Sequence, residues 1–368
     1  MPLSLHPPPI RFDESLERVE PDEAETVEQL IETLTRINRT TLDHDKHAHR
    51  SVHAKSHALL TGELIVPGDL PRELAQGIFA REGRYPLVMR LSTVPGDILD
   101  DSVSTPRGMA VKIIGVEGER LPGSDGDTTQ DFVLVNGPVF SAPNAKRFAS
   151  SLKLVAATTD RAEGAKKALS AVLRGTERVI EAFGGKSATL INLGGQPETH
   201  PLGDTYYSQA PLRFGDYVVK LSIAPHSPNL TALTDAGLDL DGKRNGLREA
   251  MVEHFASQGG EWEVRVQFCT DPETMPIEDA SVAWPEEKSP YIDVARIVLP
   301  PQPAWNAVRR AAIEDGLAFS PWHGIAAHRP LGSVMRARRV AYKVMARFRA
   351  HHNGVTIREP RSIADLRI

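Results

Sequence analysis

The chain has 368 residues, of which 40% are hydrophobic and 25% charged, so it can bury a substantial core in one large domain or two ordinary ones. Its formal net charge of −5 argues against a general nucleic-acid binder, since proteins that neutralise many phosphates are usually basic. The single cysteine, Cys269, excludes an internal disulfide and any zinc or iron–sulfur site built from several cysteines. One unpaired thiol suits a reducing compartment.

The N-terminal residues 1–9 contain no basic segment followed by an apolar core, so no signal peptide is expected. No uncharged apolar run is long enough to span a bilayer. We therefore expect a cytoplasmic protein without a membrane span.

The predicted elements of the first half are a helix, four strands and further helices. A proline-rich arm precedes a helix from about Asp22 to Thr41, where apolar residues recur every three or four positions. Runs of β-favouring residues bounded by turn residues then predict strands. These strands cover residues 58–66, 87–94, 109–114 and 132–135. Sequence rich in Ala, Leu and Lys predicts helices over 144–183.

The second half returns to strands and ends in a helix. Strands are predicted at 217–223, 262–269 and 294–299, an amphipathic helix at 243–258, and a strongly basic helix at 332–352. This order favours an α+β protein with an antiparallel sheet over a doubly wound parallel one. No glycine-rich nucleotide loop is present. We expect an N-terminal arm and helix over residues 1–42 and a single core domain over 43–368.

A histidine-rich stretch precedes the first strand. It contains His44, His47, His49, His53 and His57. Imidazole clusters can bind Zn or Ni, but this spacing matches no standard motif, and the neighbouring aspartates equally fit a solvated loop. We favour a polar loop leading into a strand, with at most one histidine in a chemical role.

The basic helix near the end of the chain carries a possible ligand pair. Generically, a helix of this kind is a solvated or anion-facing surface helix. However, Arg338 and Tyr342 are four residues apart and share one helix face. A guanidinium beside a phenol favours the phenolate, which is a ligand for ferric iron. The other arginines of the helix would suit carboxylate partners.

Several separated blocks resemble haem catalases and occur in the same order. They are 50–55 (Arg-Ser-Val-His-Ala-Lys), 89–94 followed by 106–112, 131–140, 282–299, 319–321 and Arg338-x-x-x-Tyr342. Each block alone is weak, but together they extend from about His49 to Arg349. The resemblance implies a catalase-like antiparallel β-barrel with flanking helices, without the C-terminal helical domain of larger catalases.

The resemblance also implies a haem b between a distal histidine and a proximal tyrosine. His53 would move a proton between the two peroxide oxygens, and Ser92 would orient it through a hydrogen bond. Tyr342 would be the axial ligand, with Arg338 favouring its phenolate. The remaining implied haem contacts are the propionate-binding Arg50, Arg90 and Arg349 and the aromatic Phe140 and Phe148.

The chain departs from catalases at the distal amide and in length. Catalases carry Gly-Asn-Asn where this chain has Leu134-Val135-Asn136. An ungapped alignment places Val135 on the catalytic asparagine, whereas a small local slip restores Asn136, which we favour as the second catalytic residue. A chain shorter than typical catalases implies a more open haem and argues against an NADPH site.

These features resemble the minimal catalase-related peroxidases. The predicted activity is reduction of organic hydroperoxides or hydrogen peroxide by a small-molecule reductant, with weak dismutation, in a possible homodimer. Two alternatives stay open. One is a hydroperoxide isomerase or dehydratase of the allene-oxide-synthase type, and the other is a non-catalytic haem carrier or anionic-surface binder.

Overall fold

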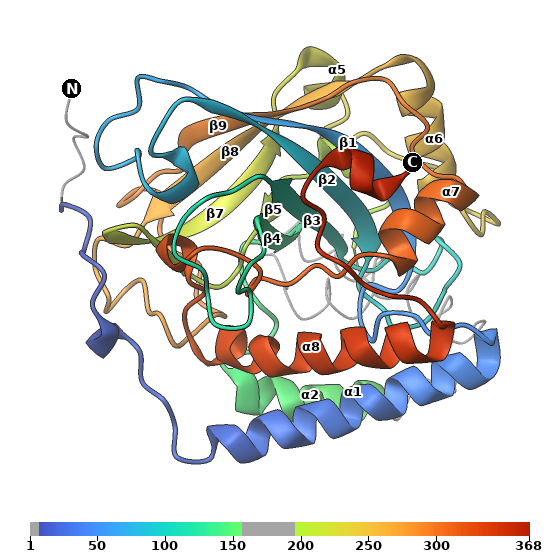
Figure 1. Ribbon diagram of the computed structural model, residues 1–368, viewed down its shortest axis with the longest axis horizontal. Helices are drawn as coiled ribbons and strands as arrows, with labels where there is room; N and C mark the ends of the chain where they lie inside the picture. The colour runs from blue at the N-terminus through green and yellow to red at the C-terminus, as the bar shows by residue number, and fades with distance from the viewer. Residues whose placement is uncertain (1–6, 157–195) are drawn as a thin grey trace, which may run out of the picture.

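The centre of the molecule is an antiparallel sheet rolled into a barrel (Figure 1). The structure, a computed structural model, describes residues 7–156 and 196–368. Within these ranges nine strands pair, always antiparallel with their neighbours. They are β1 (Ser56–Val66), β2 (Gly83–Thr93), β3 (Arg107–Ile114), β4 (Thr129–Val135), β5 (Tyr206–Tyr207), β6 (Leu212–Phe214), β7 (Tyr217–Pro225), β8 (Gly260–Phe268) and β9 (Ile292–Leu299).

The strands close into a ring through a short strand. Their order is β5-β4-β3-β2-β1-β9-β8-β7-β6, and a further pairing of β5 with β7 joins the two ends. This pairing closes eight strands into a barrel and leaves β6 outside the ring. Closure gives all eight strands two paired neighbours, so the ring has no free edge.

Side chains alternate between the barrel interior and its outer face. On β2, Leu87, Met89 and Leu91 belong to one apolar cluster to which every strand of the ring contributes. Because successive residues of a strand point to opposite faces, Arg90 and Ser92 lie on the outer face. Arg90 and Ser92, which the sequence indicated as site residues, therefore face away from the core and toward the segments that cover the outside of the barrel.

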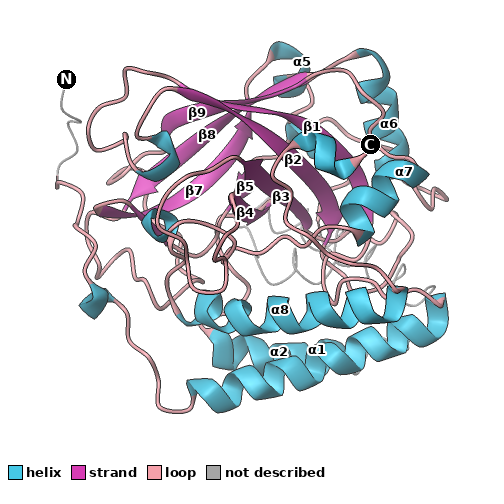
Figure 2. Ribbon diagram, viewed as in Figure 1, coloured by secondary structure: helices cyan, strands magenta, loops and turns pink. Residues whose placement is uncertain are grey.

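A layer of three helices lies beside the barrel (Figure 1). These are α1 (Glu23–Asp45), α2 (Ala145–Ala156) and α8 (Ser333–Asn353). They pack through an apolar cluster that includes Leu34 of α1, Ala149 of α2 and Ala341 of α8. Loops and the segment after α8 connect this layer to the barrel (Figure 2).

The shorter helices lie around the ends of the strands. They are α5 (Pro228–Thr231), α6 (Gly246–Ser257), α7 (Ala307–Arg309) and a π-helix, η5 (Arg310–Asp315), that directly continues α7. None of the helices in residues 7–156 and 196–368 combines the length and apolarity that crossing a membrane requires.

The structure confirms the α+β class, the antiparallel barrel and each predicted element that lies in the described residues. The helix predicted from Asp22 to Thr41 is α1, and the basic helix is α8. Residues 157–183 of the predicted helical region lie outside the described residues. The two-residue β5 and the π-helix have no counterpart among the predicted elements, because both are shorter than the patterns that sequence periodicity resolves.

Candidate functional site

His53 is fixed at the entrance to β1 by contacts to both its backbone and its ring. Its backbone N–H donates to the carbonyl of Val94 at 2.7 Å, and its own carbonyl accepts from Arg90 Nη2 at 2.7 Å. The ring Nδ1 lies 3.2 Å from Ser92 Oγ, the contact that the resemblance implied. These contacts hold both the backbone and the ring of His53.

The backbone of His53 has a φ of 57°, a left-handed conformation that is uncommon for a residue other than glycine. A glycine on β3, Gly108, makes room for the ring. A Cβ placed on Gly108 would lie 2.4 Å from Cε1 and Nδ1 of His53. Any side chain at this position would therefore displace the imidazole.

The pKa of His53 is lowered to about 3, first by burial and then by the positive charges of Arg90, Arg338 and Arg50. The imidazole is therefore neutral at pH 7 and keeps a lone pair for accepting a proton. Arg338 belongs to α8, so the charges that lower the pKa of His53 come from both the barrel and the helix layer.

Three arginines converge on one turn of the chain. Arg50 donates to the carbonyl and carboxylate of Glu314 and to the carbonyl of Leu317. Arg90 binds the Glu314 carboxylate with two groups, at 2.8 and 2.9 Å. Arg349, from α8, donates to the carbonyls of Glu314 and Leu317 at 2.8 and 2.7 Å. The three predicted propionate-binding arginines therefore form one cluster.

This arginine cluster carries more positive than negative charge. Burial lowers the pKa of Arg50 well below its usual value, and the charges of Arg90 and Arg349 lower it further. The pKa of Arg90 falls to about 9 through burial and the proximity of Arg349. Buried cations of this kind favour a further anionic partner.

The inner face of α8 brings the tyrosine and the aromatic residues to the same region. The Arg338 guanidinium lies 5.2 Å from the ring centre of Phe140, which in turn packs 4.9 Å from that of Phe148. Tyr342 is half-buried on the next turn of α8. Within residues 7–156 and 196–368, the Tyr342 hydroxyl makes no hydrogen bond.

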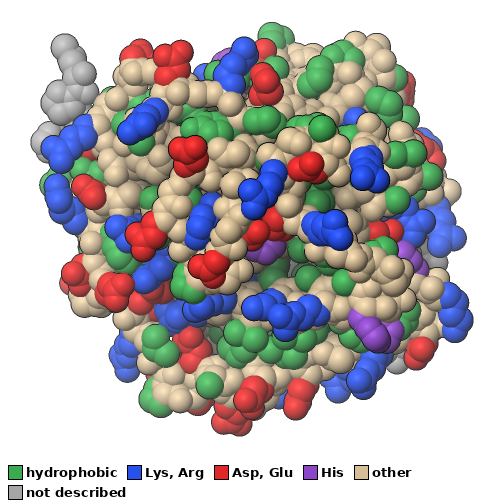
Figure 3. Space-filling model, viewed as in Figure 1, with side chains coloured by type: hydrophobic (Ala, Val, Ile, Leu, Met, Phe, Trp, Pro, Cys, Tyr) green, Lys and Arg blue, Asp and Glu red, His purple; other side chains and the backbone are tan. Residues whose placement is uncertain are grey.

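The outward side of α8 has a different character. Arg339, Lys343 and Arg347 recur every four residues, and all three are exposed. Basic side chains follow the line of this helix in the space-filling view (Figure 3). The cationic pattern seen in the sequence therefore divides into a solvated stripe and inward-facing residues that include Arg349.

Asn136 is engaged in structural contacts. Its side-chain oxygen accepts from the backbone N–H of Arg107 at 2.8 Å, and its amide nitrogen donates to Asp204 at 3.0 Å. Val135 pairs with Gly108, so both residues project from the same face of the sheet. The register thus places Val135, and not Asn136, on the face that His53 covers.

A second polar cluster lies further along the same outer face. The buried Lys112 ammonium lies 2.8 Å from Asp131 and also contacts Glu359. His323 Nδ1 lies 3.2 Å from Asp131 and 3.3 Å from Glu359. Asp131, His323 and Glu359 are a donor set that can bind a metal ion. Because the Lys112 ammonium is already bound to both carboxylates, we interpret the group as a buried ion-pair network.

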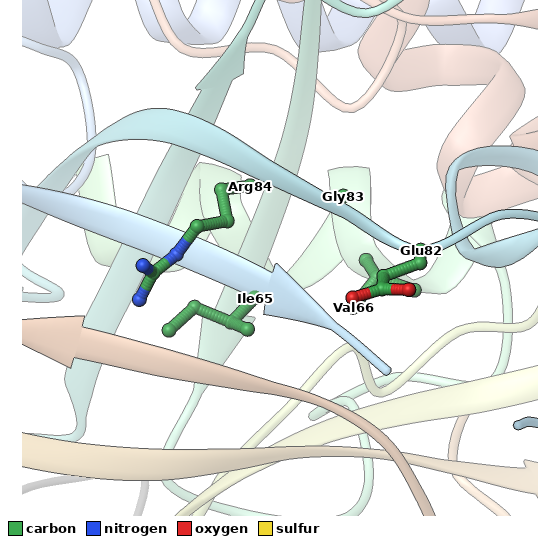
Figure 4. Close-up of a pocket in the computed structure, with 5 residues that line it drawn as sticks. All are labelled: Ile65, Val66, Glu82, Gly83 and Arg84. Atoms are coloured by element: carbon green, nitrogen blue, oxygen red, sulfur yellow. The ribbon is translucent and has the colours of Figure 1, made fainter. Parts of the chain in front are cut away.

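A surface hollow at the far end of β1 and β2 is separate from this site (Figure 4). Its lining residues are Ile65, Val66, Glu82, Gly83 and Arg84. Val66 pairs with Gly83 there, whereas Ser92 pairs with Ser56 at the other end of the same two strands. About ten residues of strand, roughly 30 Å, separate the hollow from the residues around His53.

Comparison with solved structures identifies the architecture as the catalase fold. A fungal catalase matches with a TM-score of 0.57 and 20% sequence identity, over 84% of this chain and 61% of that chain. Catalase A from Saccharomyces cerevisiae gives 0.57 and 18%, over 84% and 63%. A bacterial catalase gives 0.58 and 16%, over 99% of this chain and 70% of its own. At these identities the likeness shows the fold, and the chain spans less than two thirds of the two fungal proteins. No family model and no curated protein matches the sequence.

Sequence reasoning missed two residues that shape the site, Gly108 and Glu314. Gly108 stands in the block 106–112, but a single glycine in a strand gives no sign of what packs on it. Glu314 lies in a segment that resembles an ordinary helix end. Its bonded arginines are 264 and 224 residues away in the chain, so no local pattern marks it.

Proposed function

We propose that the protein is a haem-dependent, catalase-related peroxidase that reduces organic hydroperoxides and, less efficiently, hydrogen peroxide. The observation that carries the proposal is the convergence of His53, the half-buried Arg50, the buried Arg90 and Arg349, and the inner face of α8 on the outside of the barrel. Because one fold hosts many functions, the proposal depends on this site more than on the catalase fold.

The cofactor in this proposal is haem b, and the arginine cluster fits its two propionates. Arg50 Nε, Arg90 Nη1 and Arg349 Nε donate to no acceptor among the described residues, so each guanidinium keeps a group for a carboxylate. Glu314 is the one carboxylate hydrogen-bonded to the three arginines within the described part of the chain, so further negative charge is favourable there.

Tyr342 is the proposed axial ligand of the haem iron. Its hydroxyl has no competing hydrogen bond within the described ranges, and Arg338 lies one turn earlier on the same helix face. Ferric iron would bind the tyrosine in its phenolate form. When bound, haem would supply the two electrons that cleavage of the peroxide O–O bond consumes, and a small-molecule reductant would restore them.

His53 moves the proton in the proposed reaction. When Nδ1 donates to Ser92, Nε2 keeps its lone pair, and the lowered pKa keeps the ring neutral. Nε2 takes the proton from the terminal oxygen of R–O–O–H and delivers it to the oxygen bonded to R. This second oxygen leaves as an alcohol, or as water when the substrate is hydrogen peroxide.

The wall beside His53 favours a substrate with an organic substituent. Val135 shares the strand face of Gly108, and the amide of Asn136 is engaged with Arg107 and Asp204. A branched apolar side chain binds an alkyl group better than it orients a small polar peroxide. We assign Asn136 a structural role at this strand end and Val135 the substrate-facing position.

An absorption spectrum of the purified protein after haem supplementation tests the cofactor and its ligand. We expect a high-spin ferric spectrum of the tyrosinate type that is lost in Tyr342→Phe and retained in the control Tyr291→Phe, whose ring packs against Tyr207 of the barrel. A wild-type protein that binds no haem would overturn the proposal.

Product analysis with a fatty-acid hydroperoxide separates the remaining alternatives. An alcohol formed at the expense of a reductant supports the peroxidase, whereas an allene oxide formed without reductant supports the isomerase or dehydratase. Turnover no faster in the wild type than in His53→Ala would instead support a haem-binding protein without catalysis.

A further inference from the structure

Glu314 holds an unusual position between the arginine cluster and the histidine. It lies near the end of the six-residue π-helix η5, and the residue is only 8% exposed. π-Helical turns are rare and occur often at functional sites. A carboxylate this deeply buried requires charged or hydrogen-bonding partners, and Glu314 has two arginines.

Arg90 connects Glu314 to His53. Its Nε and Nη2 bind the two oxygens of the Glu314 carboxylate at 2.8 and 2.9 Å, an arrangement that fixes the guanidinium plane. The same Nη2 also donates to the backbone carbonyl of His53 at 2.7 Å. Movement of the guanidinium would therefore weaken the bond to His53.

His53 depends on such support because its left-handed backbone is intrinsically unfavourable. The Arg90 bond holds the carbonyl end of this residue, and the bond to Val94 holds its N–H end. Losing one of the two leaves the backbone free to relax, and the ring would then move relative to Ser92.

We propose that Glu314 is a positioning residue for His53 and acts through Arg90. The inference rests on the proposed function of His53 and extends it, since Glu314 touches neither the peroxide nor the imidazole. The same carboxylate also neutralises part of the arginine cluster. A test must therefore separate the position of His53 from the affinity for haem.

The test compares Glu314→Gln with Asp315→Asn. Both variants remove one negative charge from the same turn, but Asp315 pairs with His47 and not with Arg90. The readout is hydrogen exchange of the His53 backbone amide in the haem-free protein. We expect exchange to be about tenfold faster in Glu314→Gln, the effect of one charge-assisted hydrogen bond, and unchanged in Asp315→Asn.

A second readout uses the haem-loaded proteins. At equal haem content, the peroxide reaction of Glu314→Gln should slow by about tenfold or more, while the Tyr342-dependent absorption stays the same. Asp315→Asn should react like the wild type. An equal slowing in both variants would mean that charge, and not the Arg90 contact, is responsible, and would overturn the inference.

Arg90→Lys provides the test if Glu314→Gln does not fold. Lysine keeps a positive charge beside Glu314, but its one ammonium nitrogen cannot reproduce the two-nitrogen contact with the Glu314 carboxylate that fixes the guanidinium plane. The bond to the His53 carbonyl should therefore weaken, and His53 exchange should again accelerate. Wild-type exchange in a folded Glu314→Gln or Arg90→Lys overturns the inference. Because the exchange readout needs no haem, it remains decisive when the wild type binds none and the proposed function fails.

Discussion

The two sides of the candidate site differ in how much of their geometry the protein itself fixes. On the barrel side, His53 is held through its N–H, its carbonyl, its ring nitrogen and the flat surface of Gly108. On the α8 side, the hydroxyl of Tyr342 has no hydrogen-bond partner in the described ranges. The helix is anchored through apolar packing and through ion pairs of Arg336 near its N-terminus.

This difference shows which side chains of the site are held in place by the protein before a ligand binds. A group that transfers a proton must be oriented within a narrow range, and the barrel provides that orientation. A group that coordinates an ion gains its orientation from the bond to the ion, so the helix has only to present it. The predictions below disturb one side at a time, from the largest expected effect to the smallest.

Gly108→Ala should disable the barrel side alone. The new Cβ would lie 2.4 Å from the His53 ring and push it away from Ser92. Since positioned general acid–base groups contribute roughly 100- to 10,000-fold, we expect peroxide turnover to fall by about 100-fold or more. The Tyr342-dependent absorption should persist. Gly237→Ala, where a Cβ meets nothing within 4 Å, is the control. Normal turnover in Gly108→Ala would contradict the assigned position of His53.

Arg336→Ala should weaken the α8 side alone. Its guanidinium contacts Glu17, Glu23 and Glu278, with N–O distances of 2.7 to 2.8 Å, and its removal leaves three carboxylates without this counter-charge. We expect the free energy of unfolding to fall by about 3 kcal/mol in urea denaturation. Arg347→Ala, an exposed change on the same helix, should stay within about 0.5 kcal/mol. Equal losses in both variants would refute the role of the ion pairs.

A pH titration should also distinguish barrel from helix. His328 is 1% exposed in the barrel core, and burial lowers its pKa from 6.5 to about 3. Below pH 6.5 the unfolded chain binds a proton that the folded protein excludes, so this histidine destabilises the fold as pH falls toward 3.

The corresponding variant is His328→Gln. Between pH 7.5 and 5, we expect it to lose about 2 kcal/mol less of its unfolding free energy than the wild type does. The control is His351→Gln, an exposed change on α8, which should lose as much unfolding free energy over this pH range as the wild type does. Chemical denaturation at the two pH values measures the unfolding free energy of each protein. An equal loss of unfolding free energy in all three proteins would contradict the role assigned to His328.

Val135→Asn should alter substrate preference on the barrel side. An amide on the face of Gly108 could orient hydrogen peroxide beside His53, and the lost apolar surface would weaken alkyl binding. We expect the ratio of hydrogen-peroxide to alkyl-hydroperoxide turnover to rise by about tenfold, the effect of one added hydrogen bond. Val133→Asn, one pleat repeat along the strand, is the matched control. An equal change of this ratio in both variants would contradict the substrate-facing position assigned to Val135.

The sequence predicted the barrel strands because their side chains alternate or are continuously apolar between clear turn residues. It predicted α1 and α8 because their apolar positions recur with helical spacing. The contact between His53 and Ser92 came from the catalase resemblance and is present in the structure. The chemical roles of His53, Tyr342 and the arginines stay proposals.

The rest of the site could not be predicted from the sequence, because its residues are far apart in the chain and meet only in the folded protein. Nothing near Glu314 in the sequence indicates that Arg50 and Arg90 will bind it. The choice between Val135 and Asn136 depended on strand register, since a shift of one residue moves every side chain to the other face. The slip that we favoured from the sequence would place Asn136 beside His53, whereas the observed register gives that face to Val135.

The closure of the barrel by β5 has a consequence for how molecules approach His53. β5 meets β4 through one residue pair, Val135 with Tyr207, and meets β7 through two. Loss of these three pairs breaks the ring beside Val135, while the other strands keep their longer ladders. The barrel wall next to His53 can therefore open locally when a few backbone hydrogen bonds of β5 break, and no whole domain has to move.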